Sequence, residues 1–225
     1  MNIPVLGKND LIYTYKEQWF NGFAPCFDNG LFSLACCKGA KNGRGMRQSI
    51  GKHFSEDRDI WVLSIAGNDI TVINPKHHNT SMFNGKYINH QHHDAIYLAK
   101  INEVITWSEY VNRFPNRNDC IYRIKGDKIK CINKKHHNDS NILTDCASDC
   151  PDIFRTLHQV LLSEEYYVFE AGVTVESGSC LDINRGFAFN EKANTEPRTE
   201  ALNKLLEANA DKIIMKRGFD PFSKS

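Results

Sequence analysis

The chain has 225 residues, 41% of them hydrophobic and 24% charged, so it can bury a sizeable core as one domain or as one domain with an appendage. Its 28 basic and 27 acidic side chains almost cancel, so whole-chain charge does not argue for a nucleic-acid partner, and any phosphate-binding surface must be a local patch. No apolar run reaches the roughly 18 residues of a membrane span, and the first residues lack the pattern of a signal peptide. We therefore expect a cytoplasmic protein with no membrane partner.

Several strands are predicted in the first third of the chain, including a strand or short helix at residues 31–37 and a hairpin arm at 70–73. Apolar and aromatic side chains alternate over residues 11–15, which predicts the first strand. Residues 48–58 are polar and are expected to be exposed. The β-branched and aromatic run at residues 60–66, IWVLSIA, predicts another strand, and Gly67-Asn68-Asp69 after it predicts a hairpin turn.

The middle of the chain carries clear local signals. Residues 95–104, AIYLAKINEV, read as one long strand. Thr106 and Glu109 have the spacing of a capping box and predict the start of a short helix. Residues 120–124 and 128–132 flank a turn sequence and predict a hairpin.

The last third mixes helices and a strand. Helical spacing of apolar residues predicts a helix at residues 151–160, an apolar run predicts a strand at 166–171, and Thr195 can cap a helix that extends to about residue 210. The order of elements predicts an α+β fold with a mostly antiparallel, partly closed, barrel-like sheet, flanking helices and a C-terminal helix. We assign residues 1–175 to the α+β domain and 176–225 to a C-terminal extension whose helix packs on the same core.

A glycine-rich basic segment ends the stretch from Gly22 to Arg47. Its cations include Lys38, Arg44 and Arg47, and such a loop can bring backbone N–H groups and positive charge to a phosphate. The alternative is a solvated basic loop with no ligand.

Cysteines and histidines suggest further chemistry. Cys36 and Cys37 precede a lysine and could supply an activated thiolate, although a cysteine pair in an apolar stretch also fits core packing. Zinc needs three or four converging ligands. Adjacent histidines on an extended chain point opposite ways, and the Cys-x3-Cys pair is not matched by a second such pair. We therefore expect no metal and no cofactor. If a metal were bound, the candidate ligands are His90, His92, Cys146 and Cys150.

Aromatic side chains lie near the predicted strand ends and the basic loop. Aromatic faces beside lysine and arginine suit base stacking, and the alternative is that these rings fill the core. The candidate base-binding residues are Phe23, Pro25, Asn29, Trp61, Ser64 and Trp107.

Five segments, taken together and in order, carry a family resemblance. They are Gly22–Pro25 with Leu34–Lys38 and Met46-Arg47; Asp59–Val62; Ile96–Ile101; Thr106–Tyr110; and Val160–Ser163 with Tyr166–Phe169. They resemble the nucleotide-modification-associated domain family, type two. Gly39 stands where the family has proline, and Glu170 stands where it has glycine.

The resemblance implies a bacterial or phage protein concerned with modified DNA bases or nucleotides, in a DNA-modification or phage-defence context. The family's order of elements is also similar to small barrels that read a flipped base in an aromatic cage.

Three functions follow from these patterns. The first is a module that binds a nucleotide or nucleic acid through a modified base, with Lys38, Arg44 and Arg47 on phosphate. The second is an enzyme acting on a nucleotide or modified base with Cys36 or Cys37 or a bound metal. The third is a subunit that binds a protein partner through the helix at 196–210, whose leucines could equally pack on the chain's own core.

Overall fold

The computed structural model describes residues 3–20, 25–27, 30–35, 45–55, 57–72, 90–117, 119–120, 122–125, 128–131, 158–183, 187–189 and 195–215. Three helices are described: α1 (Met46–His53), α2 (Trp107–Arg113) and α4 (Thr195–Ala208). The strands of the first half are β1 (Leu11–Phe20), β2 (Phe32–Leu34), β3 (Ile60–Val72), β4 (Ala95–Lys100) and β5 (Glu103–Thr106). The others are β6 (Tyr122–Lys125), β7 (Lys128–Cys131), β8 (His158–Ser163), β9 (Glu165–Phe169), β10 (Phe187–Phe189) and β11 (Ile213–Met215).

The centre of the fold is a six-stranded sheet with the order β10-β1-β3-β4-β9-β11. All its neighbours are antiparallel except β1 and β3, which run parallel because the chain between them crosses over through β2 and α1. A second sheet has the order β2-β8-β5, and β6 and β7 form a separate hairpin. The α+β class and the mostly antiparallel pairing are therefore confirmed, and the described strands do not close into a barrel.

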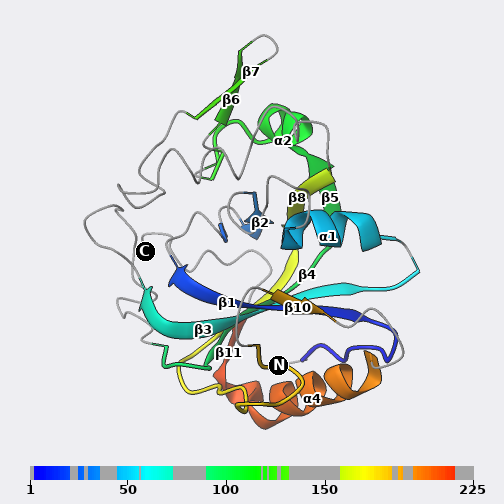
Figure 1. The fold of residues 1–225 in the computed structure, drawn as a ribbon, viewed down its shortest axis with the longest axis vertical. Coiled ribbons are helices and arrows are strands. Elements are labelled where there is room, and N and C mark those ends of the chain that lie inside the picture. Colours follow the sequence, from blue (N-terminus) through cyan, green and yellow to red (C-terminus); the bar gives the residue numbers. More distant parts are fainter. Residues whose placement is uncertain are drawn as a thin grey trace.

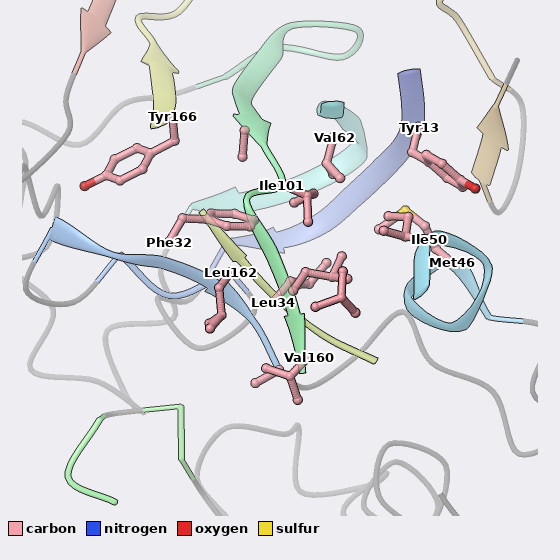
Figure 2. Close-up of a cluster of buried hydrophobic side chains, with 14 of the residues drawn as sticks. Tyr13, Phe32, Leu34, Met46, Ile50, Val62, Ile101, Val160, Leu162 and Tyr166 are labelled. Carbon is pink, nitrogen blue, oxygen red and sulfur yellow. The ribbon is translucent and has the colours of Figure 1, made fainter. Parts of the chain in front are cut away.

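Both faces of the six-stranded sheet are covered. Alternating residues of β1 show this, because Tyr13 belongs to the core on one face and Ile12 to the core on the other. Figure 1 shows α4 below the sheet, with α1 and the three-stranded sheet above it. On the upper side, Tyr13 of the sheet and Met46 and Ile50 of α1 point toward one another (Figure 2).

Two sequence expectations near β3 are wrong. The predicted hairpin at Gly67-Asn68-Asp69 does not form, because β3 runs through these residues as one strand. The turn residues instead coincide with a slip in register, since Glu17 pairs with Ala66 and Trp19 pairs with Thr71. The polar stretch 48–58, expected to be exposed, contains most of α1, in which Gln48 and Ile50 are buried.

The predicted strand at 95–104 is two strands in two sheets. β4 joins the large sheet, and β5 joins β8 after a short connection at Ile101 and Asn102. The predicted hairpin after residue 120 is confirmed as β6 and β7. The helix predicted for 151–160 is wrong at its end, where Val160 lies in β8; residues 151–157 lie outside the described residues.

The C-terminal helix is confirmed as α4, and its apolar stripe faces the chain's own sheet. Leu202 and Leu206 are fully buried in the lower core, with Leu205 packed beside them. The stripe considered for protein docking is therefore covered within the chain. None of the described helices has the length and apolarity needed to cross a membrane.

The capping box at the start of α2 is confirmed, and its contribution to the stability of the fold can be measured. The Thr106 hydroxyl oxygen accepts a hydrogen bond from the Glu109 N–H at 3.1 Å, and the Thr106 N–H donates to Glu109 Oε2 at 2.8 Å. We expect Thr106→Ala to lower the free energy of unfolding by about 1 kcal/mol, measured by urea denaturation. Glu109→Gln keeps a group that can accept the reciprocal bond, so a loss as large as that of Thr106→Ala would contradict the assignment.

Candidate functional site

Polar groups gather on the upper face of the large sheet, near its centre. The register places Tyr15 of β1 beside Ser64 of β3, and Ser64 beside Tyr97 of β4. Side chains directly opposite each other in neighbouring strands share a face, so the three side chains stand in one row. All three are buried, with exposed fractions of 1% or less. Buried polar groups in an apolar sheet need an explanation.

A chain of hydrogen bonds joins the two tyrosines to a buried carboxylate. The Tyr15 hydroxyl donates to Glu17 Oε2 at 2.8 Å, and the Tyr15 and Tyr97 hydroxyls are hydrogen-bonded to each other. Burial raises the pKa of both tyrosines, and the negative charge of Glu17 raises each further. Both phenols therefore keep their protons at neutral pH, and Glu17, itself 3% exposed, accepts hydrogen bonds in the interior.

Ser64 differs from its neighbours in this cluster. Its hydroxyl oxygen is buried and has no hydrogen-bond partner among the described residues. Leaving a hydroxyl unpaired in the interior costs about 1–3 kcal/mol relative to pairing it. The cluster thus retains one unused donor and acceptor beside the tyrosines.

Aromatic rings from β2, β9 and the segment before β2 pack near the cluster. The Phe27 ring lies 5.7 Å from that of Tyr97 and 5.0 Å from that of Tyr166, centroid to centroid. Phe32 of β2 lies 5.4 Å from Tyr97, and Figure 2 shows Phe32 and Tyr166 in this core. Pro25, a predicted binding residue, is buried two positions before Phe27. The polar row therefore has aromatic walls.

Irregular strand pairing adjoins the cluster. The register between β3 and β4 shifts between Ser64 and Ile65, and the register between β1 and β3 shifts between Glu17 and Trp19. Such irregularities are over-represented next to functional sites because they redirect side chains. Here they occur in both pairings that join the three strands supplying the polar groups, β1 with β3 and β3 with β4.

The two tryptophans considered for base stacking do not share a site. Trp61 belongs to the lower core, where its Nε1 donates to Asp10 Oδ2 at 3.0 Å and Lys100 lies over its ring. Trp107 begins α2 and is fully buried in the upper core. The sheet separates them, so the two rings cannot stack on one base.

Arg47 has a structural contact. Its side chain is fully buried, and Nη1 donates to the Gln159 carbonyl oxygen at 3.1 Å. The neighbouring Gln48 amide donates to Gln159 Oε1 at 2.7 Å. These bonds hold α1 against β8, and Arg47 offers no exposed guanidinium to a phosphate.

Several predicted residues cannot be placed. Phe23, Asn29, Cys36, Cys37, Lys38, Arg44, Cys146 and Cys150 lie outside the described residues. Among the metal candidates that are described, His90 is buried and His92 is exposed. Within the described part of the chain, no three His, Cys, Asp or Glu side chains are grouped so that they could hold a metal ion.

In a second buried polar cluster, around Arg117 and Asp119, the side chains are hydrogen-bonded to one another. Arg117 donates through Nη2 to the Leu31 carbonyl oxygen at 2.9 Å and to Ser33 Oγ at 2.8 Å. Ser33 Oγ and the Tyr110 hydroxyl donate to the two oxygens of Asp119, at 2.6 and 2.5 Å. This network ties the segment around β2 to α2, and its role is to hold the fold together.

The sequence reasoning missed Tyr15, Glu17 and Tyr97. A usable signal existed at Tyr13, Tyr15 and Glu17, which alternate along one face of β1, although the predicted strand ended at residue 15. A glutamate on the same face as two aromatic residues predicts an inward carboxylate. No comparable pattern singles out Tyr97.

Comparisons with known proteins leave the site to be interpreted from its geometry. No model of a known protein family matches the chain. No curated protein matches it, and no solved structure does.

Proposed function

We propose that this protein is a binding module that recognises the base of a nucleotide or nucleic acid, through the cluster of Tyr15, Glu17, Ser64 and Tyr97. The observation that carries the proposal is the buried Ser64 hydroxyl, which has no hydrogen-bond partner among the described residues. Ser64 lies opposite Tyr15, whose hydroxyl donates to the buried Glu17 carboxylate. A ligand that pairs this hydroxyl removes a cost that the unliganded protein bears.

The donors and acceptors favour a base with an amino group. The Glu17 carboxylate accepts hydrogen bonds only, which suits an exocyclic amine. The Ser64 hydroxyl can donate to a ring nitrogen next to that amine. Adenine and cytosine, with or without modification, present this pair of groups, and thymine or uracil do not.

The surroundings suit a planar ligand. Phe27, Phe32 and Tyr166 provide aromatic faces around the polar row. In this proposal the six-stranded and three-stranded sheets are two walls of the partly closed, barrel-like enclosure predicted from the sequence. Lys38 and Arg44 hold the phosphate, and the modified base and the DNA-modification context come from the family resemblance.

Replacing Ser64 tests the proposal without disturbing the fold. We expect Ser64→Ala to leave the unliganded protein as stable as the wild type or more stable, because a buried hydroxyl without a partner is removed. We expect the same variant to bind the ligand about 10-fold more weakly. The measurement is a thermal-shift and calorimetric titration with the four nucleoside monophosphates and their base-methylated forms.

Ser163 provides the matched control. It is equally buried, but its hydroxyl donates to the Glu165 carbonyl oxygen at 2.7 Å and accepts from the Glu165 N–H at 3.1 Å. Ser163→Ala should therefore lower stability and leave nucleotide binding unchanged. Binding of uracil and adenine nucleotides with equal affinity, or unchanged binding in both Ser64→Ala and Glu17→Gln, would reject the proposal.

A further inference from the structure

Aromatic rings form a parallel stack at the β10 edge of the large sheet. Phe189 of β10 lies opposite Tyr13 of β1, with ring centroids 4.7 Å apart and planes 7° apart. Phe187 is stacked with Phe189 at 6.3 Å and 20°. Tyr13 is fully buried, whereas Phe187, Ala188 and Phe189 are each partly exposed. Phe187 and Phe189, at the outer end of the stack, are therefore less buried than Tyr13.

The last turn of helix α1 contacts this stack through His53, and it also carries Lys52. The His53 ring lies 5.4 Å from Phe189, and its Nδ1 is 2.8 Å from the Tyr13 hydroxyl oxygen and 2.9 Å from the Ser49 carbonyl oxygen. These contacts fix the imidazole against the rings. Lys52 precedes it and is exposed, and α1 contains no acidic residue.

The stack adjoins the proposed base-binding cluster. Phe187 lies directly opposite Tyr15, the residue whose hydroxyl donates to Glu17. Residues paired in this way lie on the same face of the sheet. The aromatic surface thus continues from the partly exposed edge to the buried carboxylate.

We propose that β10 and the end of α1 form a stacking platform for single-stranded nucleic acid. Phe187 and Phe189 stack on bases, and Lys52 binds the phosphate backbone. Bases stack on aromatic rings without regard to sequence, and cations beside the rings follow the backbone, which is how strands without secondary structure are bound. A peptide added to the β10 edge would use backbone groups and would need neither parallel rings nor a lysine.

This inference goes beyond the proposed function, because it names a polynucleotide and a second surface. The probe is a fluorescein-labelled single-stranded oligothymidylate of about 12 nucleotides, within the length that such sites bind. Thymine presents no amino group, so it does not test the Glu17 and Ser64 cluster. Fluorescence anisotropy in low and moderate salt gives the dissociation constant of the full chain.

We expect Phe189→Ala and Phe187→Ala each to weaken oligothymidylate binding at least 5-fold. Phe189→Trp keeps a stacking face and should retain binding, whereas Phe189→Leu keeps apolar volume and should lose it. Phe114→Ala is the matched control. Phe114 is also a partly buried phenylalanine with a cation, Arg113, over its ring, but it follows α2 and is not part of the β10 stack. This variant should bind as the wild type does.

Salt dependence tests the role of charge. Lys52→Gln should reduce the slope of log affinity against log salt by about 0.7, the value for one contact between a cation and a single strand. A blunt duplex of the same length should bind more weakly than the single strand, since its bases are already stacked.

Three results would overturn the platform: no binding of oligothymidylate by the wild type, equal binding by Phe189→Ala, or preference for the duplex. The two proposals fail separately. Loss of mononucleotide binding in Ser64→Ala with normal strand binding in Phe189→Ala supports only the base-binding cluster. The reverse pattern supports only the platform.

Discussion

Replacing Arg117 with methionine is expected to lower the free energy of unfolding by about 3–5 kcal/mol, the largest effect of any single substitution considered for this chain. Arg117 is 8% exposed and contacts the carboxylate of Asp119, which is fully buried. Removing the guanidinium leaves a buried carboxylate without its cation and the Leu31 carbonyl oxygen without this donor. Both losses act on the folded state only.

The electrostatics of the pair support this size of effect. Burial lowers the pKa of Arg117, but Asp119, Cys26 and Tyr110 together outweigh burial and raise the pKa of the guanidinium, which stays charged. Burial raises the pKa of Asp119, while Arg117 and the hydrogen bonds from Ser33 and Tyr110 lower it. Urea denaturation of Arg117→Met and the wild type at neutral pH measures the difference.

Arg113 is the matched control for Arg117. It forms a two-bond contact with Glu103, with Nη2 at 2.9 Å from Oε2, but the two side chains are 45% and 43% exposed. Exposed pairs of this kind contribute roughly 0–1 kcal/mol. Arg113→Met should therefore change stability by no more than that amount. Equal losses in the two variants would show that the Arg117 network does not stabilise the fold as described.

The second large effect is a loss of stability in acid that depends on His90. This side chain is 4% exposed and its Nδ1 has no hydrogen-bond partner among the described residues. Burial lowers the pKa of His90 to about 4, although the charge of Asp94 opposes the shift. In the unfolded chain the same imidazole titrates near its ordinary pKa of about 6.5.

The direction of the change in stability with pH follows from the protons bound by the folded and unfolded states. Between pH 6.5 and 4 the unfolded state holds the proton and the folded state does not, so stability falls as the pH is lowered through this window. Below pH 4 both states are protonated and this contribution stops changing. A shift of this size corresponds to about 3 kcal/mol.

The measurement is the difference in unfolding free energy between the wild type and His90→Gln at several pH values. Carboxylates titrate in both proteins and largely cancel in the difference. We expect the wild type to lose about 3 kcal/mol relative to His90→Gln between neutral pH and pH 4. His92→Gln is the control: burial and the charges of His93 and Lys16 also lower the pKa of His92, but this side chain is exposed, so we expect a smaller relative change. A pH-independent difference between the wild type and His90→Gln would reject the prediction.

Structural elements that depend on residues close together in the chain were predictable from the sequence. The capping box at Thr106, the hairpin of β6 and β7 and the helix α4 depend on residues close in the chain, and each is present. Where the outcome depended on distant segments, the sequence was insufficient. Residues 95–104 contain no glycine or proline to mark the point where the chain leaves one sheet for another.

In the candidate site, too, the local features were predictable from the sequence and the contacts between distant segments were not. The alternation that turns Tyr15 and Glu17 to one face is visible in the sequence, but their neighbours in space are set by the pairing of β1, β3 and β4. Arg47 looked exposed because it follows a glycine-rich basic segment. Its burial comes from the packing of α1 on β8, which no local pattern encodes.

The position of β1 constrains the order in which the chain can fold during synthesis. The carbonyl and N–H of Leu6, just before this strand, bond the Asn203 side chain, 197 residues later, and Arg198 donates to Thr14 across 184 residues. Until β10 and α4 emerge from the ribosome, β1 has an unpaired edge and its lower face is uncovered. Contacts of such separation form slowly, so a ribosome-bound chain that ends before residue 187 exposes this strand to aggregation.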